Sequence, residues 1–199
     1  MEQIKKWYAQ KTERAAQMLI DHGVIAKEDK VIYQYGIAQI GYVLLYVLSY
    51  LVIALLTGNL WLLSWYLVCF TVLRVSAGGF HLKKRYTCFF LTMGCVLGIS
   101  LLLKQKEMLL PLWGQAILFA LSCAVIIRLA PIDTPNRRVD AVEYRVYRRR
   151  TLVFLGLEII IYILLQLGSL GQEAFAVFLA VFQEMIFLCL GKRESASDK

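Results

Sequence analysis

Apolar residues along the chain gather in six stretches, each about as long as a lipid bilayer is thick. A helix needs roughly 20 apolar residues to cross about 30 Å of hydrocarbon. The stretches lie at about residues 37–56, 60–80, 86–103, 108–130, 151–167 and 174–190. They predict an all-α integral membrane protein with about six transmembrane helices. The second stretch runs into Gly78 and Gly79, so we expect its end to break into a loop.

The segment ahead of the first span has a different pattern. Apolar side chains recur there every three or four residues opposite charged ones, which predicts an amphipathic helix at a membrane surface. The apolar positions are Ile4, Trp7, Tyr8, Ala15, Met18 and Leu19, and the charged ones are Lys5, Lys6, Glu13 and Arg14. We therefore expect one membrane domain over 1–199, with this helix and a linker at 1–30, a six-span bundle at 31–190 and a tail at 191–199.

Composition supports a membrane protein. Hydrophobic residues make up 59% of the chain and charged residues only 18%, a balance that excludes an ordinary soluble domain. Aromatic residues at 13% exclude a disordered chain. The net charge of +8 does not indicate nucleic-acid binding, because the basic residues lie between apolar runs and form no basic face.

The positive charges predict the orientation of the chain. Of 22 Lys and Arg residues, 20 fall in alternate segments: six before the first span, four in 74–85, seven in 128–150 and three after Leu190. Because cytoplasmic segments carry the excess of Lys and Arg, both termini and the 74–87 and 128–150 loops are predicted to be cytoplasmic. We expect the protein in a cell membrane, in contact with anionic lipid.

The chain has two histidines, and one of them lies near a cysteine. His22 follows Asp21 at the end of the surface helix, where capping of the last carbonyls explains it. His81 and Cys88 share a short cytoplasmic loop with Lys83 and Lys84. A cationic neighbourhood favours the thiolate that acts as a nucleophile. The alternative is that His81 is an interface residue and Cys88 only opens a buried span.

The spacing of this pair sets a structural condition. Seven residues in one continuous helix would separate the two side chains by roughly 10 Å. Contact therefore needs a non-helical start, which Gly78 and Gly79 permit. The remaining cysteines lie within apolar spans and behave as small hydrophobes; they are Cys69, Cys95, Cys123 and Cys189. With no CxxC and no paired spacing, we expect no metal and no cofactor.

Two segments together carry a resemblance. The pattern Arg74-x-x-x-Gly78-Gly79-x-His81-x6-Cys88, followed by the segment from Ala130 to Arg137, resembles the accessory gene regulator B family of bacterial membrane peptidases. Six spans in about 200 residues also fit. The resemblance implies processing of a small quorum-sensing propeptide (AgrD-like) by catalytic Cys88 and His81. Arg74 and Gly79 match further positions that the family needs for activity, and a homodimer is implied as well.

The resemblance also implies a mechanism. His81 takes the proton of Cys88, and the thiolate cleaves the bond before the propeptide's acidic tail to give a thioester, which a peptide side chain then closes to a thiolactone or lactone. Arg74, the Gly78 and Gly79 amides, Asp133 and Asn136 are candidates for orienting His81 or binding the oxyanion. Asp133 and Asn136 are equally explained as turn residues.

The basic residues of both loops have two interpretations. Lys83, Lys84, Arg137 and Arg138 are candidates for holding the acidic tail of the substrate. An anchor on anionic lipid explains the arginine-rich segment as well.

Other functions are less compatible with the sequence. A non-enzymatic peptide permease or scaffold subunit would leave His81 and Cys88 incidental. A thiol oxidoreductase would need a CxxC motif that faces water. A membrane zinc protease would need an HExxH motif, and the chain has neither.

Two carboxylates within the spans need an explanation. A charge there costs roughly 2.5–3.5 kcal/mol on insertion scales, so Glu158 and Glu184 must be neutral or paired. We expect at least one of them to pair with Arg74 or Arg128 and so to hold the glycine turn. The alternative is two protonated glutamates that hydrogen-bond to polar groups such as Gln166 and Gln183.

The charge distribution gives a testable topology. In a chain without native cysteines, a cysteine introduced by Lys106→Cys should react with an impermeant maleimide added outside intact cells, whereas one introduced by Ala141→Cys should not. Labelling of position 141 from outside would reverse the topology and place the candidate site on the wrong side of the membrane.

Overall fold

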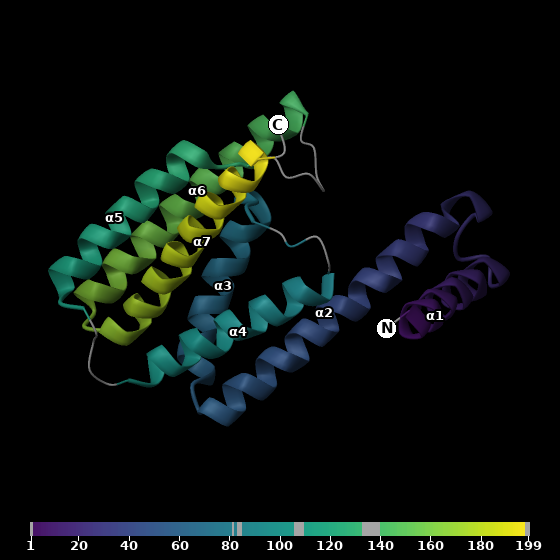
Figure 1. Cartoon of the computed structure of the whole chain (residues 1–199), viewed down its shortest axis with the longest axis horizontal. Helices are drawn as coiled ribbons and strands as arrows, with labels where there is room; N and C mark the ends of the chain where they lie inside the picture. Colours follow the sequence, from purple (N-terminus) through teal and green to yellow (C-terminus); the bar gives the residue numbers. More distant parts are fainter. Residues whose placement is uncertain (1, 81, 83–84, 106–109, 133–139, 198–199) are drawn as a thin grey trace. The chain divides into compact units, whose positions relative to one another are not determined.

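The computed structural model describes residues 2–80, 82, 85–105, 110–132 and 140–197. Its elements are α1 (Glu2–Asp21), the 3-10 helix η1 (Lys27–Asp29), α2 (Lys30–Thr57), α3 (Leu60–Ala77), α4 (Arg85–Lys104), α5 (Leu112–Leu129), α6 (Ala141–Leu167) and α7 (Gly171–Ser197) (Figure 1). Helices α2 to α7 are long and apolar enough to cross a membrane. The all-α, six-span prediction is confirmed, and the chain is a multi-pass membrane protein.

The fifth span begins ten residues earlier than the apolar stretch suggested, because a helix does not need apolar side chains at its aqueous end. The Asp140 side chain accepts hydrogen bonds from the N–H groups of Val142 and Glu143, at 2.8 and 2.7 Å. These bonds satisfy two of the donors that a helix leaves unpaired at its start. The arginines of 145–150 therefore lie on α6, which corrects the prediction of a loop over all of 128–150.

The described chain divides into two compact units, Met1–Val52 and Ile53–Lys199. In the first, α1 packs on α2 through Tyr8, whose hydroxyl donates to the carbonyl of Ala38 at 2.8 Å and whose ring meets Tyr42 edge-on. Gly41 leaves room for the Tyr8 side chain. An ion pair of 3.2 Å between Lys30 and Glu13 adds a second link between the two helices.

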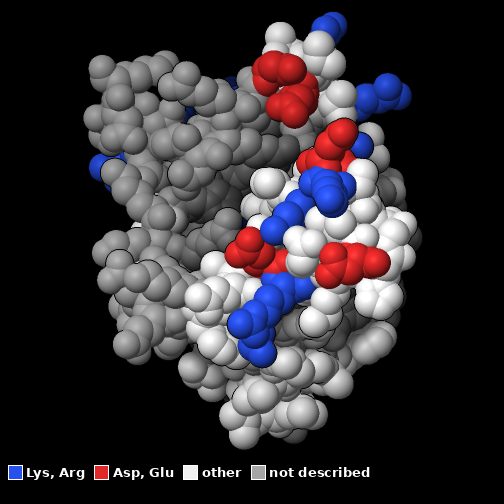
Figure 2. Space-filling model, turned by 90° about the vertical axis from the view of Figure 1, so that its right-hand side faces the viewer, with Lys and Arg blue, Asp and Glu red and all other residues white. Residues whose placement is uncertain are grey.

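The residues that α1 buries differ from several of the apolar positions expected from the sequence. Thr12 and Ala16 are buried, whereas Trp7 and Met18 remain 58% and 60% exposed. Acidic and basic side chains are interleaved on the face that Figure 2 presents. Helix α1 has four basic and three acidic residues, so its attachment to lipid would depend on its apolar side chains more than on net charge.

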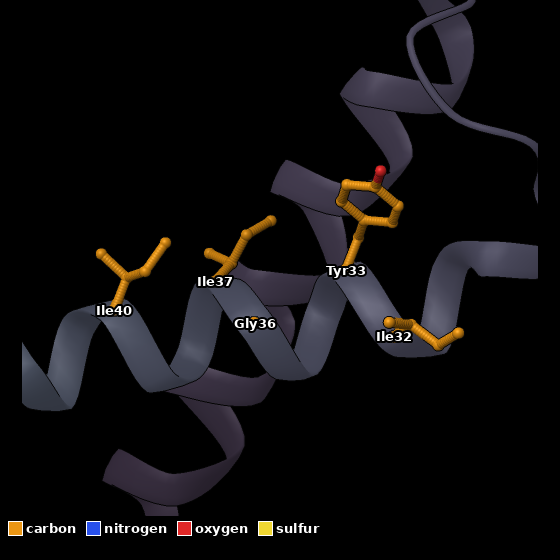
Figure 3. A pocket seen from close by; sticks show the side chains of 5 residues that line it. All are labelled: Ile32, Tyr33, Gly36, Ile37 and Ile40. Atoms are coloured by element: carbon orange, nitrogen blue, oxygen red, sulfur yellow. The ribbon is translucent and has the colours of Figure 1, made fainter.

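Helix α2 has an apolar surface with a shallow groove near its start. The groove is lined by five residues, Ile32, Tyr33, Gly36, Ile37 and Ile40, and Figure 3 shows the side chains of the four that are not glycine. Ile32 and Ile40 are largely exposed. An exposed apolar surface on a spanning helix is what contact with lipid requires.

The second unit is built around α7. This helix packs against α3, α4, α5 and α6, and Figure 1 shows it running beside α5 and α6. Its small residues Ala174, Ala176 and Ala180 are fully buried, and small side chains let membrane helices approach closely. Helices α3, α5 and α6 each bury a row of side chains that recur every three or four residues. On α3 this row is Leu63, Tyr66, Phe70 and Leu73.

A polar contact fixes the turn between α2 and α3. The Thr57 hydroxyl lies 2.6 Å from that of Ser100 on α4. The Asn59 amide donates to the Ser100 carbonyl at 2.8 Å. Ser100 is fully buried, so this pairing satisfies polar groups that would otherwise lie unpaired among apolar side chains.

The cap of α6 is testable. Asp140→Ala removes the acceptor for two N–H groups and should lower the free energy of unfolding by about 1 kcal/mol. Asp140→Asn keeps an oxygen acceptor at the same place and should remain close to the unsubstituted protein. The measurement is denaturant unfolding in mixed micelles, and equal losses in the two variants would contradict the capping role.

Candidate functional site

The end of α3 forms a sharp turn that we call the glycine turn, Gly78 to Phe80. Gly78 and Gly79 have φ angles of +75° and +113°, which side chains disfavour and glycine adopts readily. The Gly78 N–H donates to the Arg74 carbonyl at 3.2 Å and closes the helix. The predicted break at these two glycines is therefore present, and it directs the chain away from the helix axis just before His81.

Arg74 holds this turn through backbone atoms. Its Nη1 donates to the Gly78 carbonyl at 2.7 Å, and its Nη2 donates to the carbonyl of Phe80. Because the guanidinium is planar, it can serve two acceptors at once. The side chain of Arg74 is only 15% exposed, so these bonds form largely inside the bundle.

Helix α7 supplies the other side of the Arg74 site. Glu184 Oε2 lies 3.7 Å from Arg74 Nη1, and the guanidinium lies over the Phe187 ring, 4.9 Å from its centre. The Phe80 N–H donates to the Phe187 carbonyl at 2.9 Å. The turn is thus attached to α7 both directly and through Arg74.

The expected pairing of a carboxylate with Arg74 is therefore present for Glu184 but not for Glu158. Both carboxyl groups face the bundle interior, with exposed fractions of 0% and 4%. Neither carboxylate has a hydrogen-bond partner among the described residues, so the contact of Glu184 with Arg74 is an ion pair without a hydrogen bond. Arg128, the other expected partner, is exposed. Gln183, considered as a partner for a glutamate, instead accepts a hydrogen bond from the Tyr66 hydroxyl at 3.0 Å.

The start of the segment that follows Ala130, the second one that carries the family resemblance, contacts the glycine turn. The Ile132 N–H donates to the Ala77 carbonyl at 3.1 Å, and Gly78 and Ile132 form an isolated parallel bridge. A Cβ on Gly78 would lie 2.9 Å from the Ile132 carbonyl oxygen. Arg148 Nη1 donates to the Ala130 carbonyl at 2.8 Å, so one arginine of the basic run has a structural role.

Cys88 lies in the first turn of α4 and is partly exposed. Its carbonyl accepts a hydrogen bond from the Thr92 hydroxyl at 2.9 Å. The other predicted catalytic and substrate-binding residues lie outside the described residues; they are His81, Lys83, Lys84, Asp133, Asn136, Arg137 and Arg138. The pairing of His81 with Cys88 therefore stays a prediction.

The contacts of His22 and the burial of two further cysteines are explained by the fold. His22 Nδ1 lies 2.7 Å from the Met18 carbonyl oxygen, which confirms the predicted cap. Cys69 and Cys123 are buried in their spans, and all five cysteines are free thiols. Among the described residues no three His, Cys, Asp or Glu side chains lie close enough to hold a metal.

Two residues of the Arg74 site were absent from the sequence prediction. Phe187 contributes a carbonyl and a ring face, neither of which has a recognisable sequence pattern. Gly191 contributes the absence of a side chain: a Cβ there would lie 2.8 Å from the Phe80 nitrogen and 2.9 Å from the Gly79 carbonyl carbon. The sequence did contain one indication of this position: Gly191 lies inside a helix, where alanine would make the helix about 1 kcal/mol more stable.

Comparison with protein families identifies the family of the chain. The family model described as Accessory gene regulator B matches residues 12–189, which include the glycine turn, Cys88 and the segment at Ile132. The chain belongs to this family. Membership associates it with the processing of the accessory gene regulator propeptide in quorum sensing. Neither curated proteins nor solved structures give a match to the chain.

The two hydrogen bonds that the planar Arg74 guanidinium donates, which we call the Arg74 fork, can be tested. Arg74→Lys keeps the charge but removes the planar pair of donors, so propeptide cleavage should fall by about 10- to 100-fold, because misplacement of a catalytic group by about 1 Å can cost about 10²-fold in rate. Arg128→Lys is the matched control, because Arg128 is an exposed arginine near the end of another span. Cleavage is measured by mass spectrometry at equal protein level, and full activity of Arg74→Lys would exclude the fork as a requirement.

Proposed function

We propose that this member of the accessory gene regulator B family is a membrane-embedded cysteine endopeptidase with Cys88 as nucleophile and His81 as general base. The observation that carries the proposal is the anchored glycine turn, which leads directly into His81 and then into α4, where Cys88 lies in the first turn. The start of a helix has unpaired N–H groups and favours negative charge. This placement suits a thiolate nucleophile.

The reaction is a transfer of one acyl group. His81 accepts the Cys88 proton, and the sulfur attacks the carbonyl carbon just before the acidic C-terminal tail of the propeptide. The C–N bond breaks, the imidazolium gives its proton to the departing amine, and a thioester remains on Cys88. A cysteine or serine of the retained peptide then attacks this thioester, which releases a thiolactone or lactone and restores the Cys88 thiol.

Groups around the turn have separate roles in this proposal. Arg74 and Gly78 maintain the turn, because their donors are bonded to its backbone or close the helix. Asp133 and Asn136 are the candidates for orienting His81, and the bridge between Ile132 and Gly78 supports this, since it brings the start of their segment to the turn. Because the Gly78 N–H is already bonded to the Arg74 carbonyl, we propose the Gly79 N–H as the glycine donor to the oxyanion.

The charge distribution supports a cytoplasmic site. Both termini are proposed to lie in the cytoplasm, where the site would meet a newly made propeptide. Lys83, Lys84, Arg137 and Arg138 would hold its acidic tail by charge attraction. We propose a homodimer in contact with membrane lipid through α1, with no metal or organic cofactor in the reaction.

The nucleophile is tested by substitution and by trapping. Cys88→Ala should abolish cleavage, whereas Cys95→Ala, two turns further along α4, should cleave at the normal rate. Incubation of the purified protein with propeptide should give a covalent adduct that neutral hydroxylamine removes, as expected for a thioester. Cleavage at the normal rate by Cys88→Ala would refute the proposal and favour a permease or scaffold function.

A further inference from the structure

We propose that Glu184, Phe187 and Gly191 of α7 are positioning residues that hold the glycine turn and so set the place of His81. The catalytic part of this inference rests on the proposed function. Spaced by three and four residues, the three positions lie on one face of the helix. We call this set the α7 seat.

Each member of the α7 seat contributes a different contact. Glu184 places its carboxylate 3.7 Å from the Arg74 guanidinium. Phe187 places its ring under that guanidinium and offers its carbonyl to the Phe80 N–H. Gly191 leaves space for the backbone of the turn to lie directly against the helix.

Gly191 is the residue that makes the backbone contact possible. A Cβ at this position would meet the Phe80 nitrogen at 2.8 Å, and both atoms that it would approach most closely are backbone atoms, which cannot rotate away. The approach is close from the other side as well, since a Cβ on Gly79 would lie 3.2 Å from the Phe187 carbonyl oxygen. A carbonyl oxygen has two lone pairs, so Phe187 can accept the Phe80 N–H without leaving its helical bond.

The α7 seat acts on His81 through chain connectivity. Phe80 directly precedes His81, and neighbouring Cα atoms are about 3.8 Å apart. A displacement of Phe80 therefore changes the point from which the chain continues to His81. Misplacement of a catalytic group by about 1 Å can lower a rate by about 10²-fold, so a small displacement of the turn is enough to reduce turnover.

The first test is Gly191→Ala, with Gly156→Ala as the matched control. Both glycines are inside helices, but a Cβ on Gly156 meets nothing within 4 Å. Alanine favours the helix at both positions, so loss of helix stability does not explain a difference. We expect Gly191→Ala to lower kcat by about 10- to 100-fold with KM unchanged, and Gly156→Ala to behave as the unsubstituted protein.

A second measurement reads the turn without using catalysis. In a chain whose native cysteines are replaced, Phe80→Cys keeps the backbone N–H and carbonyl that bind the α7 seat. Maleimide should label this cysteine several-fold faster when Gly191→Ala is added, because the turn has left the helix. The Gly156→Ala addition should not change the labelling rate.

The carboxylate gives an independent variant in case Gly191→Ala fails to fold. Glu184→Gln removes the charge opposite Arg74 and should lower kcat and increase labelling at position 80, whereas Glu158→Gln should change neither. Normal kcat and normal labelling in both Gly191→Ala and Glu184→Gln would overturn the inference. If Cys88→Ala cleaves normally, the proposed function fails, and the labelling rates alone then decide whether α7 holds the turn.

Discussion

A single arginine inside the bundle determines how this end of the protein is arranged. A charged side chain at membrane depth costs roughly 2.5–3.5 kcal/mol unless partners compensate it. For Arg74 those partners are the Glu184 carboxylate, two carbonyls of the glycine turn and the Phe187 ring. Because a guanidinium presents its donors in a fixed plane, the partners have to come to it, and α3, the turn and α7 are brought together as a result.

Other helices support the place where α3, the glycine turn and α7 meet. Helix α7 packs against four other helices, and its fully buried alanines permit the close approach. Helix α6 reaches the same region through Arg148, which binds the Ala130 carbonyl, and the strand-like contact at Ile132 then meets the turn. Most of these contacts are made to backbone atoms, so the position of the turn depends little on its own side chains.

The sequence predicts the structure well where one contribution to the free energy outweighs the others. Six spans were predicted because burial of apolar residues outweighs other terms over about 20 positions, and the partner for Arg74 was predicted because an intramembrane charge needs one. The start of α6 was wrong because a local cap at Asp140 decides it. Phe187 and Gly191 were missed because a carbonyl contact and an absent side chain leave no pattern in the sequence. The link between His81 and Cys88 remains a prediction from their spacing and from the family.

The order of synthesis gives the position of α7 a biological meaning. The residues of α3, the glycine turn and α4 leave the ribosome before α7 does. Until α7 enters the membrane, Arg74 lacks its carboxylate and Phe80 lacks its carbonyl acceptor. A partly made chain therefore contains Cys88, the proposed nucleophile, before the glycine turn has its contacts with α7. Under the proposed function, the last helix to enter the membrane is therefore the one that completes the site, and a chain that ends before α7 would hold the glycine turn without its anchor.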